Sequence, residues 1–126
     1  MHEAEIARRH AYAPYSKFRV GAALLAADGT VVHGCNVENA SLGLSICAER
    51  NAVWKAVSSG LRDFVAVAVT AEPNHSGSPC GACRQVLYEF APDLEVYWRD
   101  RRNRILGAKI ERLLGHPFRL LPRGRS

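Results

Sequence analysis

Apolar and polar residues alternate in blocks whose lengths predict several strands. Residues 19–27 and 64–71 are almost uninterrupted apolar runs, which are typical of strands buried on both faces of a sheet. The dipeptide Asp28-Gly29 separates the first run from another apolar segment at 30–37, and this is the signature of a tight hairpin turn. The pattern therefore predicts an antiparallel pair of strands and a third strand farther along the chain.

Helical periodicity fills the intervals between the strands. From Cys47, apolar residues recur at helical spacing as far as Gly60, which suits the C-terminal cap of a helix. Further helices are predicted at 2–11, 81–90 and 109–114, and further strands at 94–99 and 104–107. A hairpin followed by alternating helices and strands indicates an α/β fold, with a mixed sheet and helices on both of its faces.

Length and composition set the expected class of protein. The chain has 126 residues, 48% of them apolar, which suits one domain spanning 1–126. No stretch approaches the roughly 20 continuous apolar residues that span a bilayer, and the first residues lack the apolar core of a signal peptide. We therefore expect a cytoplasmic protein with no membrane partner.

The positive charge of the chain comes mostly from arginine, and the formal net charge is +5. Arginines cluster at 99–104 and 119–125, as they do in proteins that bind nucleic acids or other anions. Neither cluster contains the interleaved aromatic residues that stack on bases. We interpret both clusters as solvated surface and do not expect a nucleic acid partner.

Three of the four cysteines form a candidate metal site. Without a secretion signal, the CxxC spacing of Cys80 and Cys83 favours metal or redox chemistry over a disulfide framework. These two residues enter one predicted helix, and Cys47 stands at the entry to another. Helix N-termini favour thiolates. Three protein ligands leave one tetrahedral position open, which is typical of catalytic rather than structural zinc.

Two charged residues after Cys47 extend this hypothesis. Arg50 is one turn along the predicted helix and is placed to offset the excess negative charge of three thiolates. Glu49 is either a partner of the helix dipole or a carrier of protons beside the metal. A thioredoxin-like redox pair is the rival interpretation of CxxC, but it leaves Cys47, Glu49 and Arg50 without a role.

Two other residues, His75 and Cys35, are of a type that can bind metal but are not assigned to the site. The spacing does not exclude His75 as a fourth ligand, although it is not placed beside the motifs as an obvious partner. Cys35 is expected to be a small apolar residue on a buried strand.

Four segments of the sequence resemble one enzyme family, the small homotetrameric zinc-dependent cytidine deaminases. They are AYAPYSKFRVGAALL at 11–25, GCNVENAS at 34–41, ICAERNAVWKAVSSG at 46–60 and SPCGACRQVLYEF at 78–90. The resemblance implies a three-layer α/β/α sandwich around a mainly five-stranded mixed sheet. It also implies hydrolysis of cytidine and deoxycytidine to uridine and deoxyuridine with release of ammonia, as part of pyrimidine salvage.

The resemblance assigns roles in catalysis. Cys47, Cys80 and Cys83 are implied to hold one Zn²⁺ per chain. Glu49 is implied to take a proton from the water that zinc activates, to protonate N3 of the ring and to help the ammonia leave. One carboxyl group serving both proton transfers removes the need for a second acid.

The resemblance also assigns substrate contacts. Asn36 and Glu38 match residues that bind the ribose 3′-hydroxyl, and Phe18 matches an aromatic residue packed on the base. The Ala48 N–H matches a donor to ring O2, and the Ser78 carbonyl matches an acceptor for the amino group. Phe118 matches a residue that reaches a neighbouring subunit's site. From the residues alone, Asn36 would be a turn residue, Glu38 a solvated acid and Phe18 part of the core.

One position departs from the family and leaves the substrate open. Leu42 stands where many members have a tyrosine near the 5′ side of the sugar, so an altered nucleoside preference is possible. A deaminase of another cytosine nucleoside, such as blasticidin S, is the alternative hypothesis. A nucleic-acid-directed cytosine deaminase ranks below both, since a short chain end with Phe118 suggests a site closed by neighbouring subunits.

Overall fold

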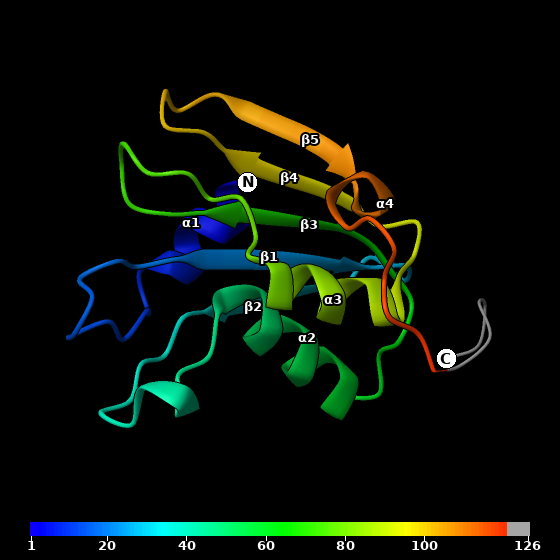
Figure 1. The fold of residues 1–126 in the computed structure, drawn as a ribbon, viewed down its shortest axis with the longest axis horizontal. Coiled ribbons are helices and arrows are strands. Elements are labelled where there is room, and N and C mark those ends of the chain that lie inside the picture. The colour runs from blue at the N-terminus through cyan, green and yellow to red at the C-terminus, as the bar shows by residue number, and fades with distance from the viewer. Residues whose placement is uncertain (121–126) are drawn as a thin grey trace.

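Five strands form one mixed sheet in the computed structural model, which describes residues 1–120 (Figure 1). The strand order is β2-β1-β3-β4-β5, and only the β3–β4 pair is parallel. The elements are α1 (His2–Arg8), β1 (Gly21–Ala26), β2 (Val31–Cys35), the 3-10 helix η1 (Leu42–Leu44), α2 (Ala48–Ser58), β3 (Phe64–Thr70), α3 (Gly81–Phe90), β4 (Glu95–Arg99), β5 (Ile105–Lys109) and α4 (Ile110–Leu113). The predicted element order and mixed sheet are confirmed.

Helices lie on both faces of the sheet, so the three expected layers are present. They cover the two faces unequally. Helices α2 and α3 lie side by side on one face, and α1 lies on the other (Figure 1). The main core fills the space between the sheet and α2 and α3, where Leu24, Val67, Val96 and Leu87 are almost completely buried. Burial of these aliphatic side chains is the chief force that holds the two layers together.

Glycine supplies the two tight backbone features that the sequence predicts. Gly29, at φ +94°, closes the β1–β2 hairpin, and its N–H donates to the Ala26 carbonyl at 3.0 Å. Gly60, also at φ +94°, follows the end of α2. Both are in the left-handed region that glycine enters without steric cost, so the predicted hairpin turn and helix end are confirmed.

The expectation that residues 64–71 are buried on both faces is wrong in part. Val65 is 45% exposed, and Ala66 and Ala68 are only half-buried. The reason is that α1 is too short to cover this face. It has seven residues and is about 10 Å long, whereas the five strands of the sheet span about 19 Å between their outer axes. Helix α1 packs on β1, β2 and only part of β3.

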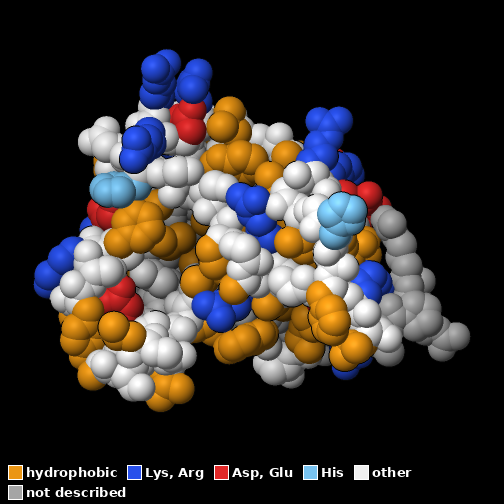
Figure 2. All heavy atoms as spheres, in the orientation of Figure 1, with side chains coloured by type: hydrophobic (Ala, Val, Ile, Leu, Met, Phe, Trp, Pro, Cys, Tyr) orange, Lys and Arg blue, Asp and Glu red, His pale blue; other side chains and the backbone are white. Residues whose placement is uncertain are grey.

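Two further expectations need correction or fall outside the described part. Cys35 lies on β2, which is an edge strand and not a buried one, and the residue is half-buried. The arginine cluster predicted at 119–125 continues past Leu120, and that part of it lies outside the described residues. The other cluster forms the β4–β5 turn, where Lys and Arg side chains gather on the surface in Figure 2.

Within residues 1–120, no helix combines the length and the apolar character that crossing a bilayer requires.

Close backbone contact between α2 and β2 fixes the position of α2. A Cβ atom added at Gly34 would lie 2.3 Å from the Ala48 carbonyl oxygen and 2.6 Å from the Ala52 nitrogen. Contacts this short require the helix to move, because both atoms belong to the backbone. The absence of a side chain at Gly34 therefore lets the first turns of α2 lie directly on the sheet.

We predict that Gly34→Ala lowers the free energy of unfolding by about 1–3 kcal/mol, the usual cost of forcing an extra group into a packed interior. Urea denaturation at a fixed protein concentration measures the effect. Gly43→Ala is the matched control, because an added Cβ there meets no atom within 4 Å. Equal denaturation midpoints for the two variants would contradict the close contact.

Candidate active site

Three thiol groups converge where two helices begin. Cys47 is the N-cap of α2, Cys80 is the N-cap of α3, and Cys83 lies in the first turn of α3. Their Sγ atoms all lie within 4.8 Å of one another. Among the described residues they are the only such group of three or more side chains of metal-binding type, and His75 does not belong to it. The predicted convergence of the two helix N-termini is confirmed.

The thiol cluster fits a tetrahedral metal ion. Zinc bound at about 2.3 Å by thiolates in tetrahedral geometry places the sulfurs about 3.8 Å apart. No two of the sulfurs here are more than 4.8 Å apart, so at most about 1 Å of approach separates them from that arrangement. Soft thiolate donors select Zn²⁺ over hard cations. Three ligands leave a fourth position open toward the pocket, which suits a catalytic ion.

Hydrogen bonds already stabilise negative charge within the cluster. The Cys83 thiol donates to Cys47, and Arg50 Nη2 donates to Cys47 Sγ at 3.1 Å, so the pKa of Cys47 is lowered to about 5. The pKa of Cys83 is raised, because its proton is held by Cys47 and because it is buried. Of these two hydrogen-bonded thiols, Cys47 therefore carries the negative charge and Cys83 keeps its proton. Arg50 occupies the place that was predicted for it.

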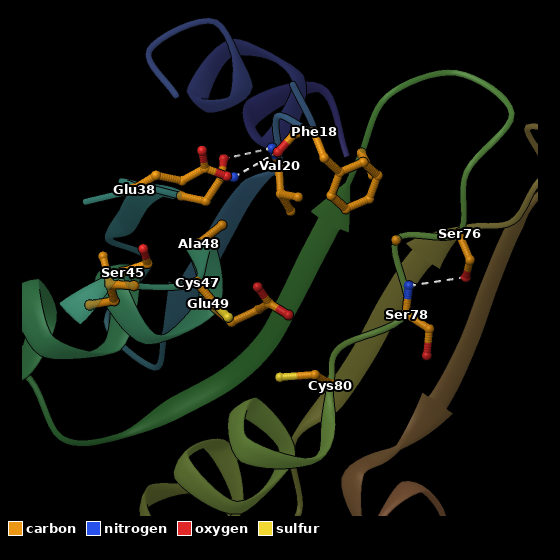
Figure 3. A pocket seen from close by; sticks show the side chains of 14 residues that line it. Phe18, Val20, Glu38, Ser45, Cys47, Ala48, Glu49, Ser76, Ser78 and Cys80 are labelled. Atoms are coloured by element: carbon orange, nitrogen blue, oxygen red, sulfur yellow. Dashed lines mark hydrogen bonds between the residues drawn. The ribbon is translucent and has the colours of Figure 1, made fainter. Parts of the chain in front are cut away.

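Glu49 is a buried acid beside the thiols. The residue is 4% exposed, and burial raises the pKa of its carboxyl group to about 7. In Figure 3 the carboxylate and the sulfurs of Cys47 and Cys80 face the same space. A carboxyl group with a pKa near neutrality both accepts and donates protons readily at pH 7.

A cavity of about 240 Å³ opens in front of the thiols and Glu49. Its volume is somewhat below the roughly 300–1,000 Å³ of typical drug-sized sites, so it suits a small ligand. It is lined by Phe18, Val20, Asn36, Glu38, Ser45, Ile46, Cys47, Ala48, Glu49, Ala71, Ser76, Gly77, Ser78 and Cys80. The cavity lies at the carboxyl end of β3, the usual position for a ligand in a sheet of this type.

Three of the predicted substrate contacts are backbone or aromatic groups on the cavity wall. Ala48 is completely buried and is the first residue of α2, so its N–H has no acceptor within the helix. Ser78 lies on the opposite wall, just before Cys80 (Figure 3). Phe18 is half-buried at the mouth and is not a member of the core cluster. The cavity therefore offers a donor and an apolar ring in one small space.

Asn36 reaches the cavity but its amide group already holds the backbone. Nδ2 donates to the Phe18 carbonyl at 2.7 Å, and Oδ1 accepts from the Val20 N–H at 2.8 Å. These two bonds pair the Asn36 amide with the backbone that leads into β1, and they keep Phe18 in place. The simple turn role that Asn36 alone suggested is wrong. Its contact with a sugar stays a prediction.

Glu38 is also engaged within the chain. Its Oε1 accepts from the Tyr15 and Ser16 N–H groups at 3.0 and 3.1 Å, and its Oε2 accepts from the Ser16 hydroxyl. These hydrogen bonds, led by the one from the Ser16 hydroxyl, lower the pKa of Glu38. A carboxylate offers about four acceptor positions, so room is left for one more donor such as a sugar hydroxyl.

Two predicted residues lie away from this cavity within the single chain. Phe118 is 66% exposed and does not line the cavity. Leu42 is 72% exposed on η1 and does not line it either. The substrate-binding role predicted for Phe118, and the position predicted for Leu42 beside the sugar, therefore stay predictions.

Sequence reasoning did not predict the positions of some neighbouring residues. His75 packs its ring edge-on against Phe18, with the ring centroids 5.1 Å apart, although the residues are far apart in the chain. Ser45, Ile46 and Ser76 line the cavity from loops without a recognisable motif. Arg84 directly follows the CxxC motif, so its position next to Cys83 was the one available hint of a role.

Comparison with known proteins places the chain in a family. The family model described as the cytidine and deoxycytidylate deaminase zinc-binding region matches residues 1–98. The chain belongs to this family. It is accordingly a deaminase that uses zinc, and the cluster of Cys47, Cys80 and Cys83 is the group of described side chains able to hold the ion.

Individual relatives support the same conclusion. A cytidine deaminase from Sporosarcina psychrophila is 50% identical over 117 residues, covering 92% of this chain and 86% of the relative. The crystal structure of a cytidine deaminase from Burkholderia pseudomallei matches with a TM-score of 0.88 and 48% identity, over 93% of this chain and 94% of that one. A blasticidin-S deaminase from Bacillus cereus is more distant, at 29% identity over 107 residues, 79% of this chain and 76% of the relative.

We predict that Cys80→Ser abolishes zinc retention, because the hydroxyl group is a poor replacement for a thiolate and only two sulfur ligands remain. Elemental analysis of the purified variant, after dialysis against a weak chelator, measures the metal content. Cys35→Ser is the matched control, since Cys35 lies outside the cluster, and it should retain about as much zinc as the unmodified protein. Full zinc occupancy in Cys80→Ser would contradict the assignment.

Proposed function

We propose that this protein catalyses the zinc-dependent hydrolytic deamination of cytidine and deoxycytidine to uridine and deoxyuridine, with release of ammonia. The observation that carries the proposal is the placement of a buried acid, Glu49, beside three convergent thiols in a cavity of small-molecule size. The family and the relatives named cytidine deaminase support the choice of substrate.

We assign the metal to Cys47, Cys80 and Cys83. When bound there, zinc supplies a water molecule of lowered pKa as the nucleophile. The protein's part is to favour negative charge at the cluster, with two helix N-termini and with the Arg50 guanidinium on Cys47. Binding of the ion would displace the remaining thiol protons.

Glu49 is the proton carrier in this proposal. It accepts a proton from the attacking water and delivers it to N3 of the ring, which makes C4 electrophilic as the C4–O bond forms. It then moves the remaining hydroxyl proton to the amino nitrogen, the C4–N bond breaks, and ammonia leaves a C4 carbonyl behind. Burial of Glu49 supports both steps, because its carboxyl group is poised to hold a proton or to give it up.

The cavity wall positions the base and the sugar. We propose that Phe18 packs on the base, that the Ala48 N–H donates to ring O2 and that the Ser78 carbonyl accepts from the amino group. Asn36 and Glu38 then bind the ribose 3′-hydroxyl. All five residues line the cavity, which supports this assignment.

A deaminase of blasticidin S is the second candidate, favoured by the relative of that name at 29% identity. The higher identity to cytidine deaminases, and the presence of Asn36 and Glu38 in the cavity, favour the nucleoside. A polynucleotide substrate needs an open groove, whereas this cavity is small.

An ultraviolet absorbance assay with four substrates separates the candidates. We predict turnover of cytidine and deoxycytidine, little or none of blasticidin S, and none of a cytosine-containing single-stranded oligonucleotide. The zinc-loaded full chain is the enzyme to use. Absence of turnover with both free nucleosides would overturn the proposed function, and preferential turnover of blasticidin S would replace it with the second candidate.

We predict that Glu49→Gln retains about one zinc per chain but loses at least about 100-fold in kcat, since an amide cannot carry the proton. Glu89→Gln is the matched control, because it makes the same chemical change at an exposed position of α3. Zinc analysis and cytidine assays on both variants check the prediction. Near-normal kcat in Glu49→Gln would exclude the proton-carrier role.

We also propose that four copies of the chain, each a single domain over residues 1–126, assemble with shared sites. Tyr12, Tyr15, Leu42 and Leu44 expose apolar side chains on segments that adjoin the cavity wall, and Figure 2 shows hydrophobic side chains gathered over the η1 region. Phe118, at 66% exposed, would reach a neighbouring site and Leu42 would face the sugar's 5′ side. Leucine offers no hydroxyl group there.

Sedimentation velocity at assay concentrations tests the shared-site proposal. We expect a tetramer as the active species, because exposed apolar surface next to the site needs a cover. A stable monomer with full activity would contradict the proposal.

Limited proteolysis tests the proposal that residues 1–126 form a single domain. Release of two stable fragments would contradict it.

We further propose a cytoplasmic location and a role in pyrimidine salvage. Three free thiols that must stay reduced to bind metal suit a reducing compartment. Cell fractionation that recovers the protein mainly outside the cytoplasm would contradict the location.

A further inference from the structure

One arginine outside the assigned machinery binds the loop that carries Ser78. Arg84 follows Cys83 in α3, and its guanidinium makes three hydrogen bonds. Nε donates to the Pro79 carbonyl at 2.8 Å, Nη2 donates to Ser78 Oγ at 3.0 Å, and Nη1 donates to the Leu113 carbonyl at 2.7 Å. One side chain thus bridges the substrate loop and the end of α4.

The three acceptors indicate a geometric role for this side chain. Each is a neutral oxygen, whereas Arg50 donates to the Cys47 sulfur. A planar guanidinium with five N–H donors in a fixed arrangement can hold several acceptors at once, which the single ammonium group of lysine cannot do. The Arg84 contacts therefore fix where the Ser78–Pro79 backbone lies relative to α3.

The far end of the bridge is itself anchored. The neighbouring residue, Gln85, donates from Nε2 to the Phe118 carbonyl at 2.8 Å and accepts from the Phe118 N–H at 3.4 Å. The segment from Leu113 to Phe118 is thus fastened to α3 at two points. Arg84 holds the loop against this anchored segment, and Pro79, which is almost completely buried, adds packing to the hydrogen bonds.

We propose that Arg84 is a positioning residue that sets the Ser78 carbonyl for recognition of the substrate's amino group. The inference rests on the proposed function, in which that carbonyl accepts from the amino group. Arg84 does not line the cavity, and in this role it acts through its hydrogen bonds to Ser78 and Pro79. It follows that loss of Arg84 impairs ligands that carry the amino group more than ligands that lack it.

The test compares cytidine with uridine, which has a carbonyl group in place of the amino group. In zinc-loaded Arg84→Ala, we expect KM for cytidine to rise about tenfold or more, the effect of losing about 1.4 kcal/mol of binding. The inhibition constant of uridine should stay within about twofold. Arg84→Lys should fall between Arg84→Ala and the unmodified protein. Zinc content should remain about one per chain in both variants.

A control variant and the activity of the unmodified protein separate the possible outcomes. Arg112→Met removes an exposed arginine from α4 and should leave KM unchanged. If the unmodified protein does not deaminate cytidine, the proposed function fails. If it does, then an unchanged KM in Arg84→Ala, an equal rise for cytidine and uridine, or zinc loss from both Arg84 variants overturns the positioning role alone.

Discussion

The convergence of two helix N-termini at the carboxyl end of β3 is the constraint on which the site depends. Cys47 begins α2 and Cys80 begins α3, so a metal ion can join two helices that are separated in the chain by a whole strand. That geometry requires α2 to lie directly on β2, which the absence of a side chain at Gly34 permits. The core beneath the two helices then holds both N-termini in one place.

The same convergence explains the electrostatics. Three thiolates and one Zn²⁺ together carry an excess negative charge, which makes a bound water less acidic than on a neutral site. Two helix N-termini and the Arg50 hydrogen bond to Cys47 oppose that charge. Glu49, buried against the same cluster, has a pKa near 7 because solvent is excluded from it. The proposed metal binding and the proposed proton transfer thus both depend on the place where the two helices begin.

The sequence predicted the elements and the chemical groups better than their tertiary contacts. Element order followed from apolar periodicity, and Cys47, Glu49, Cys80 and Cys83 followed from spacing at helix starts, because these signals are local. The open face of β3 was not predictable, since it depends on how little of the sheet α1 covers. Two contacts join segments that are distant in the chain: the hydrogen bonds of the Asn36 side chain to the Phe18 and Val20 backbone, and the packing of His75 on Phe18. Such contacts produce no periodic pattern in the sequence, so they could not be predicted from it.

The central claim is that three cysteines from two helices hold one zinc with one position left open. X-ray absorption at the zinc edge of the purified, unliganded full chain tests it most directly. The account predicts three sulfur neighbours at about 2.3 Å and one oxygen neighbour at about 2.0 Å. A shell of four sulfurs, or one that contains the imidazole nitrogen of a histidine, would contradict it.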